Sequence, residues 1–237
     1  MPPRRRSTTR TAGTGTEGTG TVQLVPMPAI GTTQMTIRKG EDWGELRPLS
    51  DEGVIVHGDA EAADVVAECL RLGRAIPPLG LLGGDLCRTL GGASDPQRLR
   101  SPRAVTFTCD LGVAVLDGAT FHFVAHLVAR RQWWRGRAVV AMNAAWLGNW
   151  NAGPRAHPGD ALLDLYEAAV PFGQRAKVRA RLPMGAHLPH PAIQGRRAAS
   201  FDLTLSRSEP VYLDGRAVGS FRRIELSIEP DALTVVI

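Results

Sequence analysis

The second half of the chain is a succession of short apolar runs, and this pattern limits the possible folds more than any other feature. The runs are separated by turn signals such as Asp117-Gly118 and Asp214-Gly215. Short runs joined by Asp-Gly turns are typical of antiparallel sheets, because glycine accepts the positive φ of tight hairpins. We include Lys177–Leu182 among these strand-like runs. The pattern predicts an antiparallel β-sandwich over residues 101–237.

The first half follows a different pattern, in which an apolar run is followed by a glycine turn and then by a helical stretch. Val54–Val56 is a short β-branched run, and Ala60–Leu72 continues with apolar residues at helical spacing. Leu79–Leu82 repeats the arrangement with a second glycine turn. Two strand–turn–helix units predict a small parallel α/β layer at residues 35–100. The pattern changes at about residues 92–103, which we interpret as a linker.

The start of the chain has neither pattern. It is rich in Thr, Gly, Pro and Arg and shows no apolar period before Val22. Such a segment buries too little apolar surface to offset the entropy lost on ordering, so we predict a disordered tail at residues 1–33. The predicted organisation is therefore α+β, with a tail, a short α/β layer and a larger β-rich segment.

The composition is that of a soluble globular protein, with 43% hydrophobic and 22% charged residues. The sequence contains no apolar run of about 18 residues and no secretory-type start, so we expect a cytoplasmic protein without a membrane span. Its cysteines, Cys69, Cys87 and Cys109, are too widely spaced for a zinc site or a disulfide framework. We expect them to be buried thiols.

Positive charge is concentrated in the C-terminal half. The formal net charge is +5, and residues 130–223 carry 15 basic and 6 acidic side chains. Such a field attracts phosphates or anionic lipid headgroups, although a solvated arginine-rich surface has the same composition. The charge is not accompanied by a helix-turn-helix, a zinc finger or an aromatic-basic RNA motif. We therefore do not expect a nucleic acid as partner.

Trp133 and Trp134 are adjacent and are flanked by basic residues on both sides. These neighbours are Arg130, Arg131, Arg135 and Arg137. Aromatic rings and cations partition together to lipid headgroups, so the segment is typical of a peripheral contact with a membrane surface. An exposed loop or a subunit interface is the alternative interpretation.

Several short motifs of the second half occur in a set order. They are Asn143, Pro154, Gly159-Asp160-Ala161-Leu162-Leu163-Asp164, His190-Pro191, Leu213-Asp214-Gly215-Arg216 and Pro230-Asp231-Ala232-Leu233. In this order they resemble the C-terminal domain of the bacterial members of the diacylglycerol kinase and sphingosine kinase-like family of lipid kinases. The resemblance implies an NAD kinase/diacylglycerol kinase-like fold, with a nucleotide-binding α/β domain before the β-sandwich.

The first half resembles the family's nucleotide-binding domain in a truncated form. From the family's Gly-Gly-Asp-Gly-Thr loop this chain keeps Gly58 and Asp59, whereas Ala60 and Glu61 replace the later glycine and threonine. The resemblance implies ATP and Mg²⁺ as cofactors. The nucleotide would be held by Gly58, Asp59, Gly83, Gly84 and Asp85, and a metal by Asp160 and Asp164.

Two replacements in the first loop weaken such a nucleotide site. Ala60 adds a Cβ atom where the family has none, and Glu61 adds a negative charge near the expected triphosphate. Two unit charges about 4 Å apart repel by roughly 4 kcal/mol at an effective dielectric constant of about 20. The phosphate loops are therefore the least family-like part of the chain.

Arg216 stands where the family has a glutamate that is expected to act as the general base toward the lipid hydroxyl. A guanidinium cannot accept that proton, so Asp214 would be the base by default or would be only a structural hairpin residue. The first functional interpretation is a divergent lipid kinase, which transfers the ATP γ-phosphoryl group to a lipid hydroxyl. The second is a non-catalytic pseudokinase that binds a lipid or phosphorylated ligand in the inter-domain cleft. An unrelated small-molecule enzyme that reuses the cleft is a third, without supporting residues.

Overall fold

The α/β part of the chain consists of the two units expected from the sequence. The computed structural model describes residues 43–237, so the predicted tail at residues 1–33 lies outside the described residues. The units are β2 (Val54–Val56) with α1 (Asp59–Arg71), and β3 (Leu79–Leu81) with α2 (Gly84–Thr89). Because β2 and β3 pair in parallel, both helices begin at the same edge of this layer.

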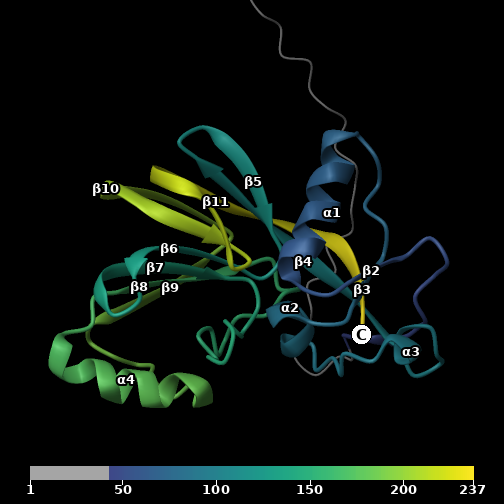
Figure 1. Ribbon diagram of the computed structural model, residues 1–237, viewed down its shortest axis with the longest axis horizontal. Coiled ribbons are helices and arrows are strands. Elements are labelled where there is room, and N and C mark those ends of the chain that lie inside the picture. Colours follow the sequence, from purple (N-terminus) through teal and green to yellow (C-terminus); the bar gives the residue numbers. More distant parts are fainter. Residues whose placement is uncertain (1–42) are drawn as a thin grey trace, which may run out of the picture. The chain divides into compact units, whose positions relative to one another are not determined.

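Antiparallel strands make up most of the remaining described chain (Figure 1). They are β4 (Val105–Leu116), β5 (Ala119–Phe123), β6 (His126–Gln132), β7 (Arg135–Met142), β8 (Leu163–Ala168), β9 (Ile193–Ala198), β10 (Ser200–Leu213) and β11 (Arg216–Val236). With β1 (Glu45–Leu46) they belong to one open sheet, whose main order is β1-β4-β11-β10-β6-β7-β8-β9. Beside this order β5 pairs with β4, and the parallel pair β2 and β3 joins the sheet through β11. The predicted fold class, a short α/β layer followed by antiparallel β-structure, is confirmed.

The long strand β11 connects the two parts of the chain. Its first half pairs with β10, its second half pairs with β4 from Ile224 to Val236, and Val235 and Val236 also pair in parallel with β3. A register shift between Glu229 and Leu233, where Asp231 has a φ of +55°, marks a bulge of the kind that bends a strand. Backbone hydrogen bonds therefore continue from one part to the other, and the predicted domain boundary near residue 101 stays a prediction.

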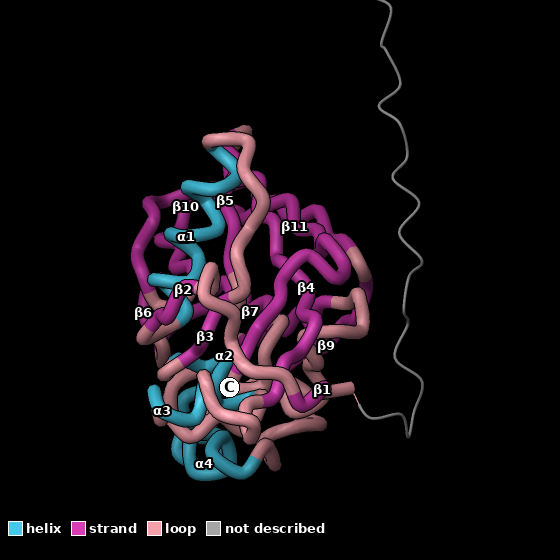
Figure 2. Tube along the Cα trace, turned by 90° about the vertical axis from the view of Figure 1, so that its right-hand side faces the viewer, coloured by secondary structure: helices cyan, strands magenta, loops and turns pink. Residues whose placement is uncertain are grey.

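One buried apolar cluster lies among the antiparallel strands and another lies in the α/β layer. Across the described residues, strands predominate over helices (Figure 2). The cluster between the antiparallel strands includes Phe123, Leu127, Leu165, Val211 and Ile224. The cluster between the parallel strands and their helices includes Val56, Val66, Leu81, Leu86 and Val235. Complete burial of each large side chain stabilises the fold by about 1.5–3 kcal/mol, so both clusters are substantial.

The predicted linker at residues 92–103 contains the short helix α3 (Pro96–Leu99). The Asp95 side chain accepts a hydrogen bond from the Gln97 backbone N–H, and proline stands at the first helical turn, which is a typical helix start. Leu99 is fully buried and belongs to a small apolar cluster with Leu49. Leu99 thus anchors this segment to the fold, while most of its other residues are exposed.

The prediction of a strand at Lys177–Leu182 is wrong, because these residues belong to the helix α4 (Arg175–Arg181) and the following turn. Alanine, lysine and arginine have high helix propensity, and Val178 and Leu182 lie four residues apart on one buried face. The helix is flanked by two 3₁₀ turns, η1 (Phe172–Gln174) and η2 (Leu182–Met184). Among the described helices, none has the length and apolar character needed to cross a membrane.

Candidate functional site

The two glycine turns of the α/β layer pack directly against each other. A Cβ atom at Gly83 would lie 2.6 Å from the His57 carbonyl oxygen, and one at Gly84 would lie 2.5 Å from the Asp59 carboxylate. Gly84 also has a φ of +95°, which glycine adopts without strain. Gly58, in contrast, has open space where a Cβ atom would lie. The close approach of the two turns therefore explains Gly83 and Gly84 without a bound phosphate.

Asp59 places a buried carboxylate between these turns. Its oxygens accept hydrogen bonds from the backbone N–H groups of Asp85 and Leu86, the latter at 3.0 Å, in the first turn of α2. Burial raises the pKa of Asp59 to about 6, and Asp214 adds to the rise, while the two N–H donors oppose it. Backbone N–H groups at a helix start are typical phosphate ligands. Here they already hold a carboxylate of the chain itself.

His126 lies at the start of β6 and faces Asp85. Its Nε2 atom is 2.8 Å from Asp85 Oδ2, and the Gly148 backbone N–H donates to the same carboxylate at 2.9 Å. Burial disfavours the charged imidazole, but the surrounding carboxylates outweigh it and raise the pKa of His126. Burial likewise opposes ionisation of Asp85, yet these two hydrogen bonds lower its pKa. Both shifts favour the ionised forms, so the contact between His126 and Asp85 favours an ion pair.

Asp214 approaches the same place from the β10–β11 turn. It has a φ of +49° and is followed by Gly215 at +81°, as expected for an Asp-Gly hairpin. Its carboxylate accepts hydrogen bonds from the backbone N–H groups of Val124, Ala125 and His126 at 2.8, 2.9 and 3.0 Å. Burial raises the pKa of Asp214, against the effect of His126 and of these N–H groups.

The structure thus brings together three of the predicted site residues and one histidine that the sequence did not single out. We call Asp59, Asp85, His126 and Asp214 the junction cluster. Burial is the main reason that Asp59 retains its proton to a higher pH, and the nearby carboxylates of Asp214 and Asp85 add to the effect. The sequence does contain a signal for His126, because this histidine lies within an apolar run. A histidine that is buried with such a run needs a polar partner.

The residues predicted to hold ATP and Mg²⁺ do not fit a triphosphate in this arrangement. Asp59 occupies the N–H groups at the start of α2, and Glu61 accepts the His57 backbone N–H at 2.7 Å across the first turn. Each glycine turn is therefore closed by a carboxylate of the chain, and that charge repels phosphate. The assignment of Gly58, Asp59, Gly83, Gly84 and Asp85 to a nucleotide stays a prediction.

Arg216, which stands at the position of the family's glutamate, reaches across to α1. Its guanidinium donates to both Asp64 carboxylate oxygens, at 2.5 and 2.9 Å. The pair borders a hollow of about 250 Å³ between α1, β5 and the β10–β11 turn, to which Ala63 and Phe121 contribute. Both charged side chains are more than half exposed, so water screens the attraction and the pair contributes little to stability. It nevertheless places a positive charge where the predicted mechanism would need a base.

Asp160 and Asp164, the predicted metal ligands, face basic side chains. Asp160 forms an ion pair with Arg197, and Asp164 Oδ2 lies 3.7 Å from Arg197 Nε. Arg155 lies 4.0 Å from the other Asp164 oxygen. Within residues 43–237, no group of three or more His, Cys, Asp or Glu side chains could hold a metal ion. These guanidinium partners do not fit a divalent cation, and the metal assignment stays a prediction.

A separate hollow lies between α4 and the strands β7 and β8, and we call it the α4 cavity. It has a volume of about 90 Å³. Its lining is mostly apolar and includes Trp133, Trp134, Val140, Leu147, Trp150, Ala168, Val178 and Leu182. Two buried ionisable groups, Tyr166 and His187, also line it. Burial raises the pKa of Tyr166 to about 12 and lowers that of His187, so both are neutral at physiological pH.

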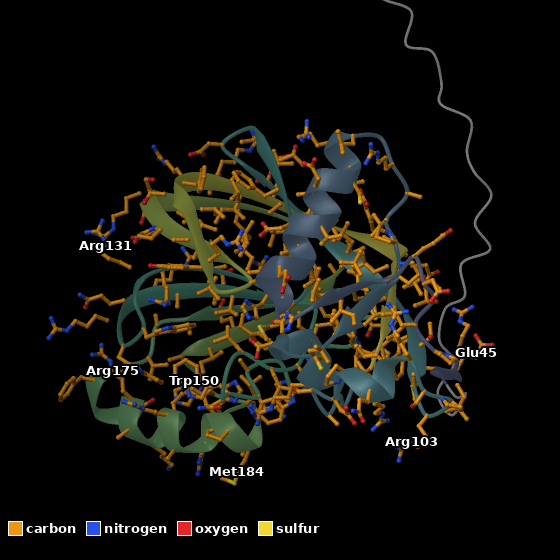
Figure 3. All side chains as sticks on the ribbon, turned by 45° about the vertical axis from the view of Figure 1, so that its right-hand side comes forward. Glu45, Arg103, Arg131, Trp150, Arg175 and Met184 are labelled. Atoms are coloured by element: carbon orange, nitrogen blue, oxygen red, sulfur yellow. The ribbon has the colours of Figure 1, made fainter. Side chains whose placement is uncertain are left out.

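The paired tryptophans contribute to this cavity. Trp133 and Trp134 both meet Trp150 edge to face, with ring centroids 5.1 and 5.8 Å apart. Figure 3 shows Trp150 between α4 and the strands, with Arg175 near one end of the helix. The Arg130 guanidinium lies 4.1 Å from the centre of the Trp133 ring, a cation–π contact. The sequence identified these residues as unusual but gave no indication of the cavity.

Comparison with known proteins supports the fold. The sequence matches no protein-family model and no curated protein. Two solved structures from Bacillus anthracis str. Sterne, each provisionally assigned as a diacylglycerol kinase, are similar to this one, with TM-scores of 0.60 and 0.55 at 15% and 16% identity. Each alignment covers 78% of this chain and 77% of the other. A diacylglycerol kinase structure from the same organism has a TM-score of 0.50 at 18% identity, covering 78% and 75%. The resemblance inferred from the motifs is therefore confirmed at the level of the fold.

Proposed function

We propose that this chain, which has the fold of diacylglycerol-kinase-like structures, binds a lipid by its hydrocarbon chain in the α4 cavity and does not transfer a phosphoryl group. The observation that carries the proposal is the cavity itself, an apolar hollow that contains three tryptophans. Its volume of about 90 Å³ suits the last few carbons of an acyl chain, since an apolar cavity of roughly 150 Å³ binds benzene. Arg175 in the lining provides a cation for an anionic headgroup.

The junction cluster supports the non-catalytic half of this proposal. A general base needs a carboxylate within hydrogen-bond reach of the substrate hydroxyl. Asp214 directs its carboxylate at three backbone N–H groups and is only 8% exposed. Asp59 and Asp85 are engaged in the same way by backbone and imidazole groups. These side chains link the α/β layer to the antiparallel strands, which is a sufficient reason for their presence.

The cavity is tested by filling it. Ala168 lines the cavity at the end of β8, whereas its neighbour Ala169 is exposed and does not line it. Ala168→Leu is expected to weaken the binding of laurate about tenfold, because excluding two methylene groups costs about 1.6 kcal/mol. Binding is measured by the quenching of tryptophan fluorescence with laurate brominated near its methyl end.

Ala169→Leu is the matched control, since it adds the same side chain on the other side of the strand end. It should leave the quenching curve unchanged. Equal binding by the two variants, or no quenching of the unmodified protein at any soluble laurate concentration, would remove the basis for a ligand in this cavity.

The second candidate, a lipid kinase that uses ATP and Mg²⁺, is supported by the fold likeness and is tested separately. Purified protein with labelled ATP, Mg²⁺ and a panel of diacylglycerols and sphingoid bases is expected to yield no labelled lipid. Arg216→Glu, which restores the family's carboxylate, is expected to yield none either, because the glycine turns remain closed by Asp59 and Glu61. Labelled lipid that is made by the unmodified protein and increases in Arg216→Glu would establish the kinase and refute the non-catalytic proposal.

A further inference from the structure

The outer side of α4 and its two flanking turns combines strong positive charge with exposed apolar side chains. Residues 168–201 contain six basic and no acidic side chains. Four of the six lie on α4, namely Arg175, Lys177, Arg179 and Arg181. Within the described part of the chain, these four have no carboxylate partner, whereas Arg196 and Arg197 pair with Glu167 and Asp160. This stretch therefore presents uncompensated positive charge.

The exposed apolar side chains lie at the two ends of the same helix. Phe172 in η1 is 84% exposed and Met184 in η2 is 73% exposed, the highest exposures of large apolar side chains in residues 43–237 together with Leu46. Figure 3 shows Met184 on the side of the helix away from the strands. The inner side of α4 carries Val178 and Leu182, which cover the α4 cavity. The helix is thus apolar inside, and outside it is basic between two apolar ends.

We propose that this surface, the α4 face formed by Phe172, Lys177, Arg179, Arg181 and Met184, docks on an anionic lipid bilayer. Cationic side chains near such a bilayer are attracted to its surface potential, each strengthening binding about fivefold. Phenylalanine and methionine at the ends insert into the boundary between headgroups and acyl chains, as in interfacial amphipathic helices. The two apolar side chains are separated by charged ones and form no continuous patch, which suits a lipid surface better than a protein partner.

This inference goes beyond the proposed ligand binding, because it concerns the outside of α4 and holds whether or not the cavity takes a chain. It also differs from the contact expected at Trp133 and Trp134, which line the cavity. Where both proposals hold, the cavity lies directly beneath the docked helix, so that a lipid chain reaches it from the membrane with little exposure to water.

The test is flotation of the full chain with vesicles made of equal parts phosphatidylcholine and phosphatidylserine, and with vesicles of phosphatidylcholine alone. Binding is expected to the anionic vesicles and to weaken at high salt, because the attraction is screened. Arg179→Glu is expected to reduce it about tenfold or more, since the change removes one positive charge and adds a negative one. The double variant Phe172→Ser/Met184→Ser should reduce it by a similar factor through lost insertion.

Two controls match these variants in chemistry but lie elsewhere. Leu46→Ser removes an apolar side chain that is also 73% exposed, and Arg103→Glu reverses an exposed charge. Figure 3 places Glu45, which precedes Leu46, and Arg103 on the side away from Arg175. Both controls should bind within about twofold of the unmodified protein, because neither belongs to the α4 face.

Three outcomes would overturn the proposal. The first is an equal loss of vesicle binding in Arg103→Glu and Arg179→Glu, which would show that net charge alone is responsible. The second is a loss of binding on replacing Arg4, Arg5 and Arg6 with serine while Arg179→Glu binds normally. The third is a protein dimer in sedimentation that dissociates in Phe172→Ser/Met184→Ser, which would assign the face to a second copy of the chain. Circular dichroism melting of each variant confirms that it is folded.

Discussion

Replacing His126 with leucine is expected to lower the free energy of unfolding by about 3–5 kcal/mol at pH 7, because it leaves buried carboxylates without their cation. His126 Nε2 lies 2.8 Å from Asp85, and the imidazole also offsets the charges of Asp59 and Asp214. Leucine has a similar size, so the loss comes from the uncompensated charge rather than from a void. Urea denaturation followed by circular dichroism measures the change.

His122→Leu is the matched control for this variant. His122 is half-buried at the end of the neighbouring strand β5, and burial lowers its pKa, so it is neutral at pH 7. It has no carboxylate within hydrogen-bond distance among the described residues. Its replacement is expected to change the free energy of unfolding by less than about 1 kcal/mol. Similar losses in the two variants would mean that the junction cluster is not held together by the charge of His126.

The sequence predicts the elements well where a turn signal and a period agree. The runs Val54–Val56 and Leu79–Leu82 are each followed by a glycine turn and a helix, and both units are present. The same signal leaves open what a glycine turn holds. From the sequence, Gly84 fits a phosphate ligand as well as it fits a residue against which another turn packs. Only the position of the Asp59 carboxylate in the structure distinguishes these two roles.

The helix α4 could not be predicted from local periodicity alone. The alternating residues Lys-Val-Arg-Ala-Arg are typical of a strand with one polar face, whereas Val178 and Leu182 are buried on one side of the helix and line the cavity beside β7 and β8. Tertiary contact with residues far away in the sequence therefore determined the outcome. The α4 cavity was missed for the same reason, since its lining comes from separate segments of the chain.

The position of Arg216 illustrates how far a motif can be carried from the sequence. The Leu-Asp-Gly turn is formed as the motif predicts, with Asp214 at a positive φ. The Arg216 side chain donates to Asp64 on α1, and no motif could indicate this because the two residues are 152 positions apart. A motif thus predicted the backbone of the turn, while the partners of its side chains depended on the fold.

A second large effect is expected from Asp59→Asn, and it depends on pH. In the folded protein burial raises the pKa of Asp59 from 3.8 to about 6, so between these values the folded chain holds a proton that the unfolded chain has released. The unmodified protein therefore loses stability as the pH rises through this window, and the loss is complete above the folded pKa. A rise of about 2 pKa units corresponds to about 3 kcal/mol. Relative to the unmodified protein, the variant should gain about this much stability between pH 4 and pH 7, measured by urea denaturation at each pH.

Two results would contradict this expectation. One is a difference in stability between the variant and the unmodified protein that stays constant over this pH range. The other is a pKa of Asp59 near its ordinary value when its carboxyl carbon is titrated by nuclear magnetic resonance. The ionised carboxylate would then be accommodated at the start of α2 without cost, because its two N–H donors would offset its burial.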